Sequence, residues 1–214
     1  MQLMGGQTVF VDKLNNSFEL GKKHDFTAAK SHDKGEQERN RRVYVNYGNQ
    51  PCMQMAYLFN YAGAPWLTQQ WSREVVDKVY SDVSPQLGYS GDEDQGLMGA
   101  LAVLMKIGIF STRGGAAEKP VYEIGSPIFE KITLHLDPQY YSGMTFTIEA
   151  KNTSSNNKYI QDATLDGKAL HQPWFYHQQL VDGGSLILEM GDSPNKEWGS
   201  GKEVAPPSMS VRRE

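Results

Sequence analysis

The sequence predicts an α-helical region followed by an antiparallel β-sandwich-like region. Apolar residues recur at helical spacing until shortly before Gly114-Gly115, and apolar and polar residues alternate after it. The turn signal Asp166-Gly167 lies between two short apolar segments, as in a β-hairpin. These observations predict a helical region at 1–115, a β region at 116–199 and a flexible tail at 200–214.

One short helical patch and three helices are expected in the first region. Apolar residues at 9–20 have roughly helical spacing, and the charged stretch 22–42 is expected to be a loop. Its basic run at 39–42 is interpreted as a solvated surface rather than a phosphate or nucleic-acid site. Pro51 can occupy the first turn of a helix that ends at Gly63, because a first-turn N–H has no intrahelical partner.

The second and third helices differ in the pattern of their apolar residues. The second begins at Pro65 and is amphipathic. One face carries Leu67, Trp71, Val75 and Val79, and the other carries Arg73, Glu74, Asp77 and Lys78. The third, at 95–109, is apolar nearly all round, which predicts a helix that is buried on every side.

Several segments of the second region alternate as strands do. Apolar residues occupy every second position in 132–136, 144–148 and 186–190, and His135 falls on a polar face where exposure is expected. The end of the chain from about Asp192 is rich in Gly, Ser, Pro and charged residues. This composition predicts a poorly ordered tail.

Composition and charge narrow the class of protein. A net charge of -4 argues against a nucleic-acid binder, which is normally basic. No apolar run approaches transmembrane length, and the N-terminus lacks the charged-then-apolar pattern of a signal peptide. The single cysteine, Cys52, excludes an intramolecular disulfide and is expected to be a buried, inert thiol.

Residues 88–96 place three acids on a glycine-rich turn immediately before the apolar third helix. Asp92 and Asp94 lie two positions apart, where the positive end of the helix dipole can keep carboxylates ionised. Ionised carboxylates at a buried helix end suit a general base or a metal ligand. The alternative interpretation is that one acid caps the helix and another is a spare charge.

An aromatic cluster at 173–176 lies between His171 and His177. Aromatic faces stack on pyranose rings, so the cluster can be interpreted as a sugar platform. A sandwich core or an inter-domain contact is the favoured alternative. His24 and His32 lie in the charged stretch and are expected to be solvated.

Several strings of residues occur in one order along most of the chain. They are YGNQP at 47–51, YLFNYAGAPW at 57–66, GDEDQG at 91–96, IGSPIF at 124–129, FTIEAKN at 146–152 and YIQDATLDG at 159–167. Together they resemble glycoside hydrolase family 92, the calcium-dependent α-mannosidases. The resemblance covers about residues 4–199 and implies an inverting exo-mannosidase with an (α/α)6 barrel. This chain would supply the C-terminal helices of that barrel and the β region that follows.

The resemblance also implies roles for four residues. Asp92 and Asp94 match the family's acidic pair on the general-base side, and Asp92 would also ligate Ca²⁺. Asn49 matches the asparagine of the calcium-associated GNEP motif, and Gln50 stands where the family usually has glutamate. Both are expected to bind substrate and Ca²⁺, although a neutral amide at Gln50 weakens the attraction for a cation. The family's catalytic acid is a glutamate upstream of GNEP, so no residue of this chain is assigned that role.

Two classes of function follow from this resemblance. The first is the C-terminal portion of an α-mannosidase that supplies the general base and the calcium side of the site. The alternative is a non-catalytic carbohydrate-binding or structural module, inactive as an isolated chain. Expected partners are mannose-containing glycans and either the missing N-terminal half or another copy of the chain. The parent protein is expected to be periplasmic or secreted, and the mannosidic linkage that it cleaves is left open.

Overall fold

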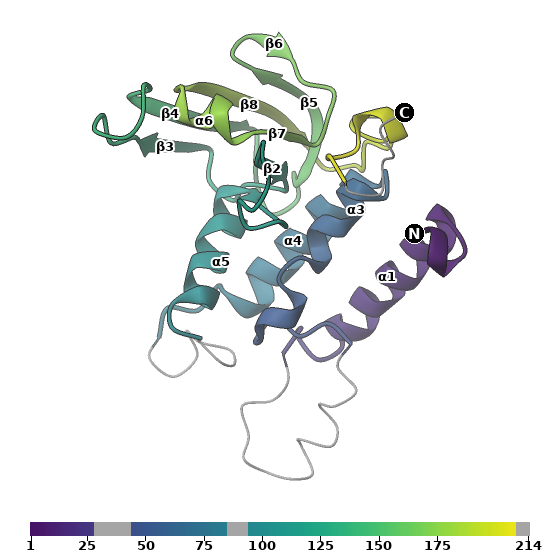
Figure 1. Ribbon diagram of the computed structural model, residues 1–214. Coiled ribbons are helices and arrows are strands. Elements are labelled where there is room, and N and C mark those ends of the chain that lie inside the picture. The colour runs from purple at the N-terminus through teal and green to yellow at the C-terminus, as the bar shows by residue number, and fades with distance from the viewer. Residues whose placement is uncertain (28–43, 85–93, 209–214) are drawn as a thin grey trace.

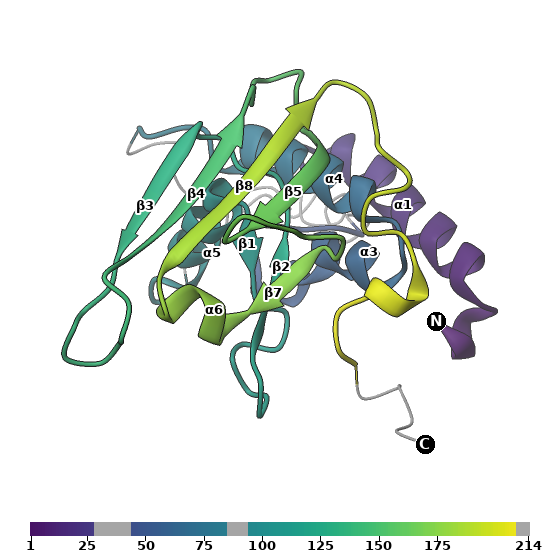
Figure 2. The same cartoon turned by 90° about the horizontal axis from the view of Figure 1, so that it is seen from above.

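The computed structural model describes residues 1–27, 44–84 and 94–208, which form a helical region beside two β-sheets (Figures 1 and 2). The helices are η1 Gln2–Met4, α1 Gln7–Lys22, η2 Gln50–Cys52, η3 Met55–Tyr57, α3 Leu58–Tyr61, α4 Pro65–Val79, α5 Leu97–Ile107, α6 His177–Val181 and η4 Lys202–Val204. The strands are β1 Ile109–Phe110, β2 Val121–Ile124, β3 Lys131–His135, β4 Thr145–Lys151, β5 Tyr159–Leu165, β6 Lys168–Ala169, β7 Trp174–Tyr176 and β8 Gly184–Gly191. The predicted order of helices before strands is confirmed.

The helix predicted between Pro51 and Gly63 is interrupted. Pro51 lies in the first turn of η2, as expected, but α3 begins only at Leu58. The backbone N–H of Ala56 donates to the hydroxyl of Tyr47 at 3.0 Å, so this donor does not bond a helical carbonyl. The predicted loop and its basic run at 39–42 lie largely outside the described residues, and so does His32.

The amphipathic helix α4 begins at Pro65 as predicted, but one of its charged residues is buried. The side chain of Arg73 lies against the β region, and the residue is 5% exposed. Its guanidinium donates to the carbonyl oxygen of Pro127, to Thr153 Oγ1 at 3.2 Å and to the carbonyl oxygen of Ser154 at 2.5 Å. The prediction that Arg73 lies on the solvated face is wrong, because its Nη1 and Nη2 groups donate to acceptors from the β region.

Helix α5 is buried on one face only. Met98, Leu101 and Met105 lie in the core of the helical region, whereas Leu97 is 38% exposed and Val103 is 56% exposed. The prediction of a helix buried on every side is therefore wrong for the described residues. Within the part of the chain that the structure describes, no helix is long and apolar enough to cross a membrane.

The β region consists of two sheets that share one core. The first sheet has the order β1-β2-β7, and the second has the order β3-β4-β8-β5-β6. Side chains from both sheets meet in this core, where Phe146 of β4 stacks on Phe175 of β7 with ring centroids 5.7 Å apart. The predicted Asp166-Gly167 turn joins β5 and β6, with Leu165 opposite Lys168. A sandwich-like packing of two sheets is thus observed.

One pairing departs from the expected antiparallel arrangement. Strands β4 and β8 run parallel, with Ile148 opposite Leu186. A parallel pair needs a long crossover, and the chain between these strands forms β5, β6, β7 and α6 before it returns. The purely antiparallel prediction is therefore wrong at the centre of the larger sheet.

The segment after β8 packs against both regions. The indole N–H of Trp198 donates to the carbonyl oxygen of Leu170 at 2.9 Å, and Trp198 is buried. The indole N–H of Trp174 donates to the carbonyl oxygen of Val204 at 2.9 Å. A side chain at Gly63 would lie 2.8 Å from the carbonyl oxygen of Ser200, so glycine permits this close approach. The described residues up to 208 therefore belong to the packed structure, and 209–214 lie outside them.

Candidate functional site

Asp94 lies on the turn that enters α5. Its backbone φ is 54°, and Gln95 and Gly96 continue the left-handed conformation with φ of 60° and 92°. Non-glycine residues rarely adopt this conformation and do so most often where the surrounding structure imposes it. The side-chain atom Oδ2 of Asp94 is buried, and no described group donates a hydrogen bond to it. A buried carboxylate oxygen without a donor is uncommon in folded proteins and calls for an explanation.

The structure bears on the capping alternative for this turn. The residue before the first turn of α5 is Gly96, and no side chain caps the helix. The described acid of the turn, Asp94, therefore does not act as the helix cap. Asp92, the other predicted acid of the pair, lies outside the described residues, as does Glu93. Its assignment as a catalytic residue and metal ligand stays a prediction.

Asn49 and Gln50 lie where an extended segment meets the turn η2. Asn49 is half-buried and has an extended backbone, and Gln50 is exposed. Within the described part of the chain, neither side-chain amide makes a hydrogen bond, so both amide oxygens can accept a ligand. The fully buried Tyr47 fixes this segment, because its carbonyl oxygen accepts a 2.7 Å hydrogen bond from the hydroxyl of Tyr80.

The described parts of the predicted site lie at the same end of the helical region. They are Asp94 and the segment that carries Asn49 and Gln50. In Figure 1 the start of α5 and the segment that enters η2 are both at the end opposite the β-sheets. The hydrogen bond from Tyr80, just after α4, holds the Asn49 segment at that end. No hydrogen bond or ion pair among the described residues joins Asp94 to Asn49 or Gln50. The roles predicted for these residues are not decided by this arrangement and stay proposals.

The described residues contain no group of three or more His, Cys, Asp or Glu side chains that could hold a metal ion. A calcium ion, however, takes six to eight oxygen ligands, and amide oxygens are among those it accepts. The unengaged amides of Asn49 and Gln50 fit such a site as partial ligands. Further oxygens would have to come from other residues.

A second buried carboxylate, which the sequence analysis did not single out, lies at the other end of the helical region. Glu123 of β2 is fully buried, and its Oε1 accepts from the hydroxyl of Tyr61 at 2.5 Å and from Thr112 Oγ1 at 2.9 Å. Its Oε2 accepts from the backbone N–H of Thr112 at 2.9 Å. Burial raises the pKa of Glu123, although these donors oppose the effect.

The hydrogen bonds of Glu123 identify it as a structural group. They join strand β2 to the end of α3 and to the segment after β1. Both oxygens of this carboxylate accept at least one hydrogen bond. The signal in the sequence was a lone acid between Tyr122 and Ile124 in an apolar strand. A charged residue at such a position is normally retained only with partners.

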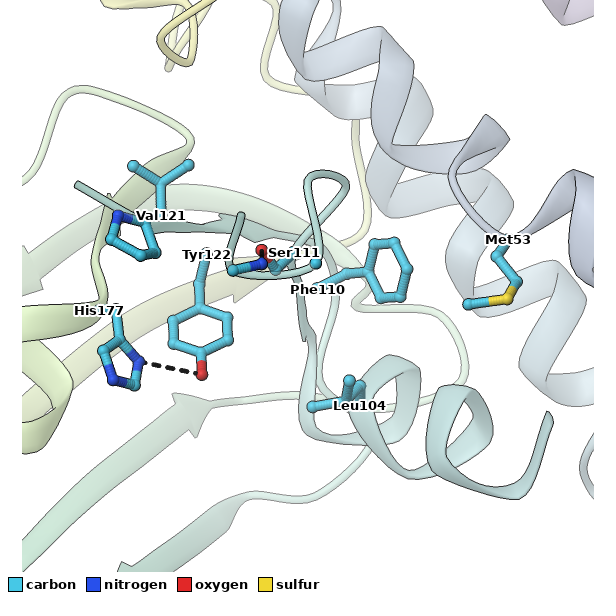
Figure 3. Close-up of a pocket in the computed structure, with 10 residues that line it drawn as sticks. Met53, Leu104, Phe110, Ser111, Val121, Tyr122 and His177 are labelled. Atoms are coloured by element: carbon cyan, nitrogen blue, oxygen red, sulfur yellow. Dashed lines mark hydrogen bonds between the residues drawn. The ribbon is translucent and has the colours of Figure 1, made fainter. Parts of the chain in front are cut away.

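A cavity of about 450 Å³ lies between the helical region and the smaller sheet (Figure 3). Met53, Leu104 and Phe110 line one side, and Tyr122 and His177 line another. Nδ1 of His177 lies 3.3 Å from the hydroxyl of Tyr122, within hydrogen-bond distance. The cavity is thus mainly apolar, and its polar lining includes Ser111 and the His177–Tyr122 pair.

The structure decides between the interpretations of the remaining candidates. Phe175 is fully buried and Trp174 is 8% exposed, so these central residues of the 173–176 cluster form core rather than a sugar platform. His24, His135 and His171 are exposed, as expected for the first two. Cys52 is half-buried and burial raises the pKa of its thiol, which agrees with the expected low reactivity.

Comparison with known families identifies the class of this protein. Residues 1–192 match the glycosyl hydrolase family 92 catalytic domain. The chain therefore belongs to this family, and the resemblance seen in its motifs is confirmed. The match reaches from α1 through β8, so the helical and β regions both lie within it.

Individual relatives agree with this classification. An uncharacterized secreted glycosidase of Arthroderma benhamiae is 32% identical over 166 residues, which are 77% of this chain and 20% of that protein. A family GH92 α-mannosidase from Bacteroides thetaiotaomicron superimposes with a TM-score of 0.78 at 27% identity, covering 96% of this chain and 24% of that one. A family GH92 inverting mannosidase from the same organism superimposes with a TM-score of 0.76 at 32% identity. The match covers 98% of this chain and 28% of that one. The chain therefore spans only a fifth to about a quarter of the length of these relatives.

Proposed function

We propose that this chain is the C-terminal portion of an inverting, exo-acting α-mannosidase and supplies the general-base and calcium side of its active site. The observation that carries the proposal is Asp94, a carboxylate held in a rare backbone conformation at a helix entrance, with one buried oxygen that no described group satisfies. Membership of family 92 supports a mannoside of a glycan as the substrate.

Inversion at a sugar carbon needs two carboxyl groups with different tasks. One protonates the leaving oxygen, and the other takes a proton from the attacking water on the opposite face of the ring. The two groups stand roughly 6.5–9.5 Å apart so that the water fits between them. In the proposed mechanism Asp94 or Asp92 accepts the proton from water. The oxygen of Asp94 that lacks a described donor suits this role, because its lone pairs are not committed to a structural hydrogen bond.

The proposed calcium site uses Asn49, Gln50 and Asp92. When bound, the cation would hold sugar hydroxyl groups and lessen the repulsion between neighbouring carboxylates. The amide side chains of Asn49 and Gln50 would orient the sugar through their remaining N–H groups. Because Gln50 carries no charge, the proposed site binds Ca²⁺ more weakly than one with a glutamate at this position.

The general acid has no candidate among the described residues. Glu123 is the fully buried glutamate, but its oxygens already accept three hydrogen bonds and it lies beyond the far end of α5 from Asp94. Eleven residues of helix span about 16 Å, which exceeds the separation that an inverting pair requires. The proposal therefore places the acid in the remainder of a longer parent protein, periplasmic or secreted like the relative named a secreted glycosidase.

The proposal is tested by assaying the chain on aryl α-mannosides, alone and within the longer parent protein, in the presence of Ca²⁺. The isolated chain is expected to show no turnover, and the parent is expected to release the β-anomer of mannose first, as NMR would show. Turnover by the isolated chain at ordinary enzyme rates would refute the proposal that the general acid lies outside this chain. A parent that binds glycans without hydrolysing them would support the alternative, a non-catalytic carbohydrate-binding module.

A further inference from the structure

The loop between β3 and β4, which we call the aromatic loop (residues 137–144), carries large exposed side chains. Tyr140 is 78% exposed, Tyr141 is 40% exposed and Met144 is 80% exposed. Single exposed apolar residues are ordinary on protein surfaces, but groups of them mark interaction sites. Figure 2 shows this loop projecting beyond the edge of the larger sheet, away from the helical region.

The aromatic loop is held in one conformation by its own backbone. The carbonyl oxygen of Asp137 accepts hydrogen bonds of 3.0 Å from the N–H groups of both Tyr140 and Tyr141. The N–H of Leu136 donates to the carbonyl oxygen of Met144 at 2.9 Å and closes the base of the loop. A fixed loop presents its rings without the entropy loss that ordering a mobile segment on binding would require.

A contact with α6 fixes the direction of the aromatic loop. The N–H of Gly143 donates to the carbonyl oxygen of Val181 at 3.0 Å. A side chain at Gly143 would lie 2.4 Å from the backbone of Asp182, so only glycine permits this contact. The hydroxyl of Ser142 also donates to the carboxylate of Asp182 at 3.2 Å. The loop and α6 therefore form one rigid corner of the molecule.

The polar pair in the cavity wall lies at the opposite end of α6. His177 is the first residue of this five-residue helix, which is only about 8 Å long. Because Gly143 and Ser142 contact the residues at the other end of this short helix, the aromatic loop lies near the pair. Exposed aromatic rings and the His177–Tyr122 pair thus lie within one short stretch of surface.

We propose that the aromatic loop, together with His177 and Tyr122, is a glycan-binding surface for a short α-mannosyl chain, separate from the candidate catalytic site. Aromatic faces pack on the C–H groups of sugar rings, and hydroxyl and imidazole groups exchange hydrogen bonds with sugar hydroxyls. The choice of α-mannosyl chain rests on the proposed function. The surface is distant from Asp94, because that residue precedes the end of α5 that lies away from the sheets (Figure 1).

The chemistry of this corner disfavours other occupants. The aromatic loop contains Asp137 and no lysine or arginine, whereas surfaces that bind anionic membranes carry several basic residues. A stable protein–protein interface buries about 800 Å² on each partner, far more than two tyrosines and a methionine at a loop tip offer. A neutral sugar chain needs neither basic charge nor a broad apolar surface.

The test is affinity electrophoresis of the chain in gels that contain α-mannan, with the β-glucan laminarin as the control polysaccharide. The wild-type chain is expected to be retarded by α-mannan and not by laminarin. Tyr140→Ala and Tyr141→Ala are each expected to weaken this binding by roughly three- to tenfold, since one aromatic contact contributes about 0.5–1.5 kcal/mol. Tyr140→Phe keeps the ring and is expected to bind nearly as wild type.

Phe129→Ala supplies the matched control. Phe129 is 49% exposed and precedes β3, at the end of that strand opposite the aromatic loop, so its removal is expected to leave retardation unchanged. The proposal is overturned if the wild-type chain is not retarded by α-mannan, or if both alanine variants at 140 and 141 bind as wild type. Retardation is measured without turnover, so this result does not depend on whether the parent protein hydrolyses mannosides, which the assay of the proposed function tests.

Discussion

Two carboxylates at opposite ends of the helical region have contrasting surroundings. Glu123 is enclosed where the helices meet the sheets, and three donors satisfy its oxygens. Asp94 lies at the other end in a left-handed conformation, with one buried oxygen that no described group satisfies. A carboxylate with a complete set of donors stabilises a fold, whereas one that lacks them retains its capacity to bind a ligand or a proton.

The largest effect is expected from Asp94→Asn in the longer parent protein. Loss of a general base typically lowers the rate by 10²–10⁴-fold, so we expect kcat to fall by about that factor. The free energy of unfolding is expected to change little, because the carboxylate of Asp94 accepts no hydrogen bond from a described side chain. Steady-state assays and urea titrations measure the two quantities. Asp12→Asn, on the exposed face of α1, is the control and should affect neither.

Among the substitutions at Asp94, Glu123 and Tyr61, Glu123→Ala is expected to lower the free energy of unfolding most. The substitution removes a buried acceptor. Three donors then lose the carboxylate that accepts from them: the hydroxyl groups of Tyr61 and Thr112 and the backbone N–H of Thr112. We expect the free energy of unfolding to fall by about 3 kcal/mol, as measured by urea denaturation. Glu123→Gln keeps one acceptor oxygen and should lose less. A Glu123→Ala chain as stable as wild type would contradict the structural role.

Tyr61→Phe tests one donor of the same network. The substitution removes the hydroxyl that donates to Glu123 and leaves both hydrogen bonds from Thr112 in place. Because Tyr61 is half-buried, we expect a loss of about 1 kcal/mol in urea denaturation. Tyr44→Phe, at an exposed tyrosine, should leave stability unchanged. Equal effects of the two substitutions would show that the hydroxyl of Tyr61 contributes nothing specific.

The smallest expected effect is that of pH on the free energy of unfolding. Burial raises the pKa of Glu123 in the folded state above its ordinary value of 4.5. The contribution of Glu123 to stability is therefore fully present below that value and is lost as pH rises through the raised pKa. As pH falls toward 4.5, the free energy of unfolding of the wild type should therefore rise relative to that of Glu123→Gln. Urea titrations at several pH values measure this shift, and a difference that is independent of pH would count against it.

Local patterns in the sequence predicted much of the fold. The start of α4 at Pro65 follows from a proline that fits a first turn, and its spacing of four residues gives the buried Trp71 and Val75. Alternation predicted β3, β4 and β8 because each lies in a sheet with one face toward a core. These elements depend on neighbouring residues, so their signals are present in short stretches of sequence.

Features that depend on distant residues could not be predicted in the same way. The acceptors of Arg73 lie 53–81 positions further along the chain, and no local pattern distinguishes this arginine from a solvated one. The exposed face of α5 is apolar like its buried face, so composition alone could not indicate which side is covered. The parallel pairing of β4 with β8 likewise depends on the path of the whole crossover.

The residues of the candidate site were proposed from the sequence, which did not indicate the geometry of the turn. The motif around Asp94 identified an acid at the entrance of a helix, and the family membership supports that choice. Its left-handed backbone and its unsatisfied oxygen are properties of the folded turn, and sequence patterns do not report them. Glu123 carried a readable signal, an acid in an apolar strand, but its donors come from two other segments.

The central position of β8 has a consequence for how the protein is made. This strand, the last of the larger sheet in chain order, lies between the β3–β4 pair and the β5–β6 pair. Until it leaves the ribosome, the two hairpins have no shared neighbour and their apolar faces are incompletely covered. Completion of the sheet must therefore await the end of synthesis of this region, and nascent chains halted before residue 184 are expected to depend on chaperones.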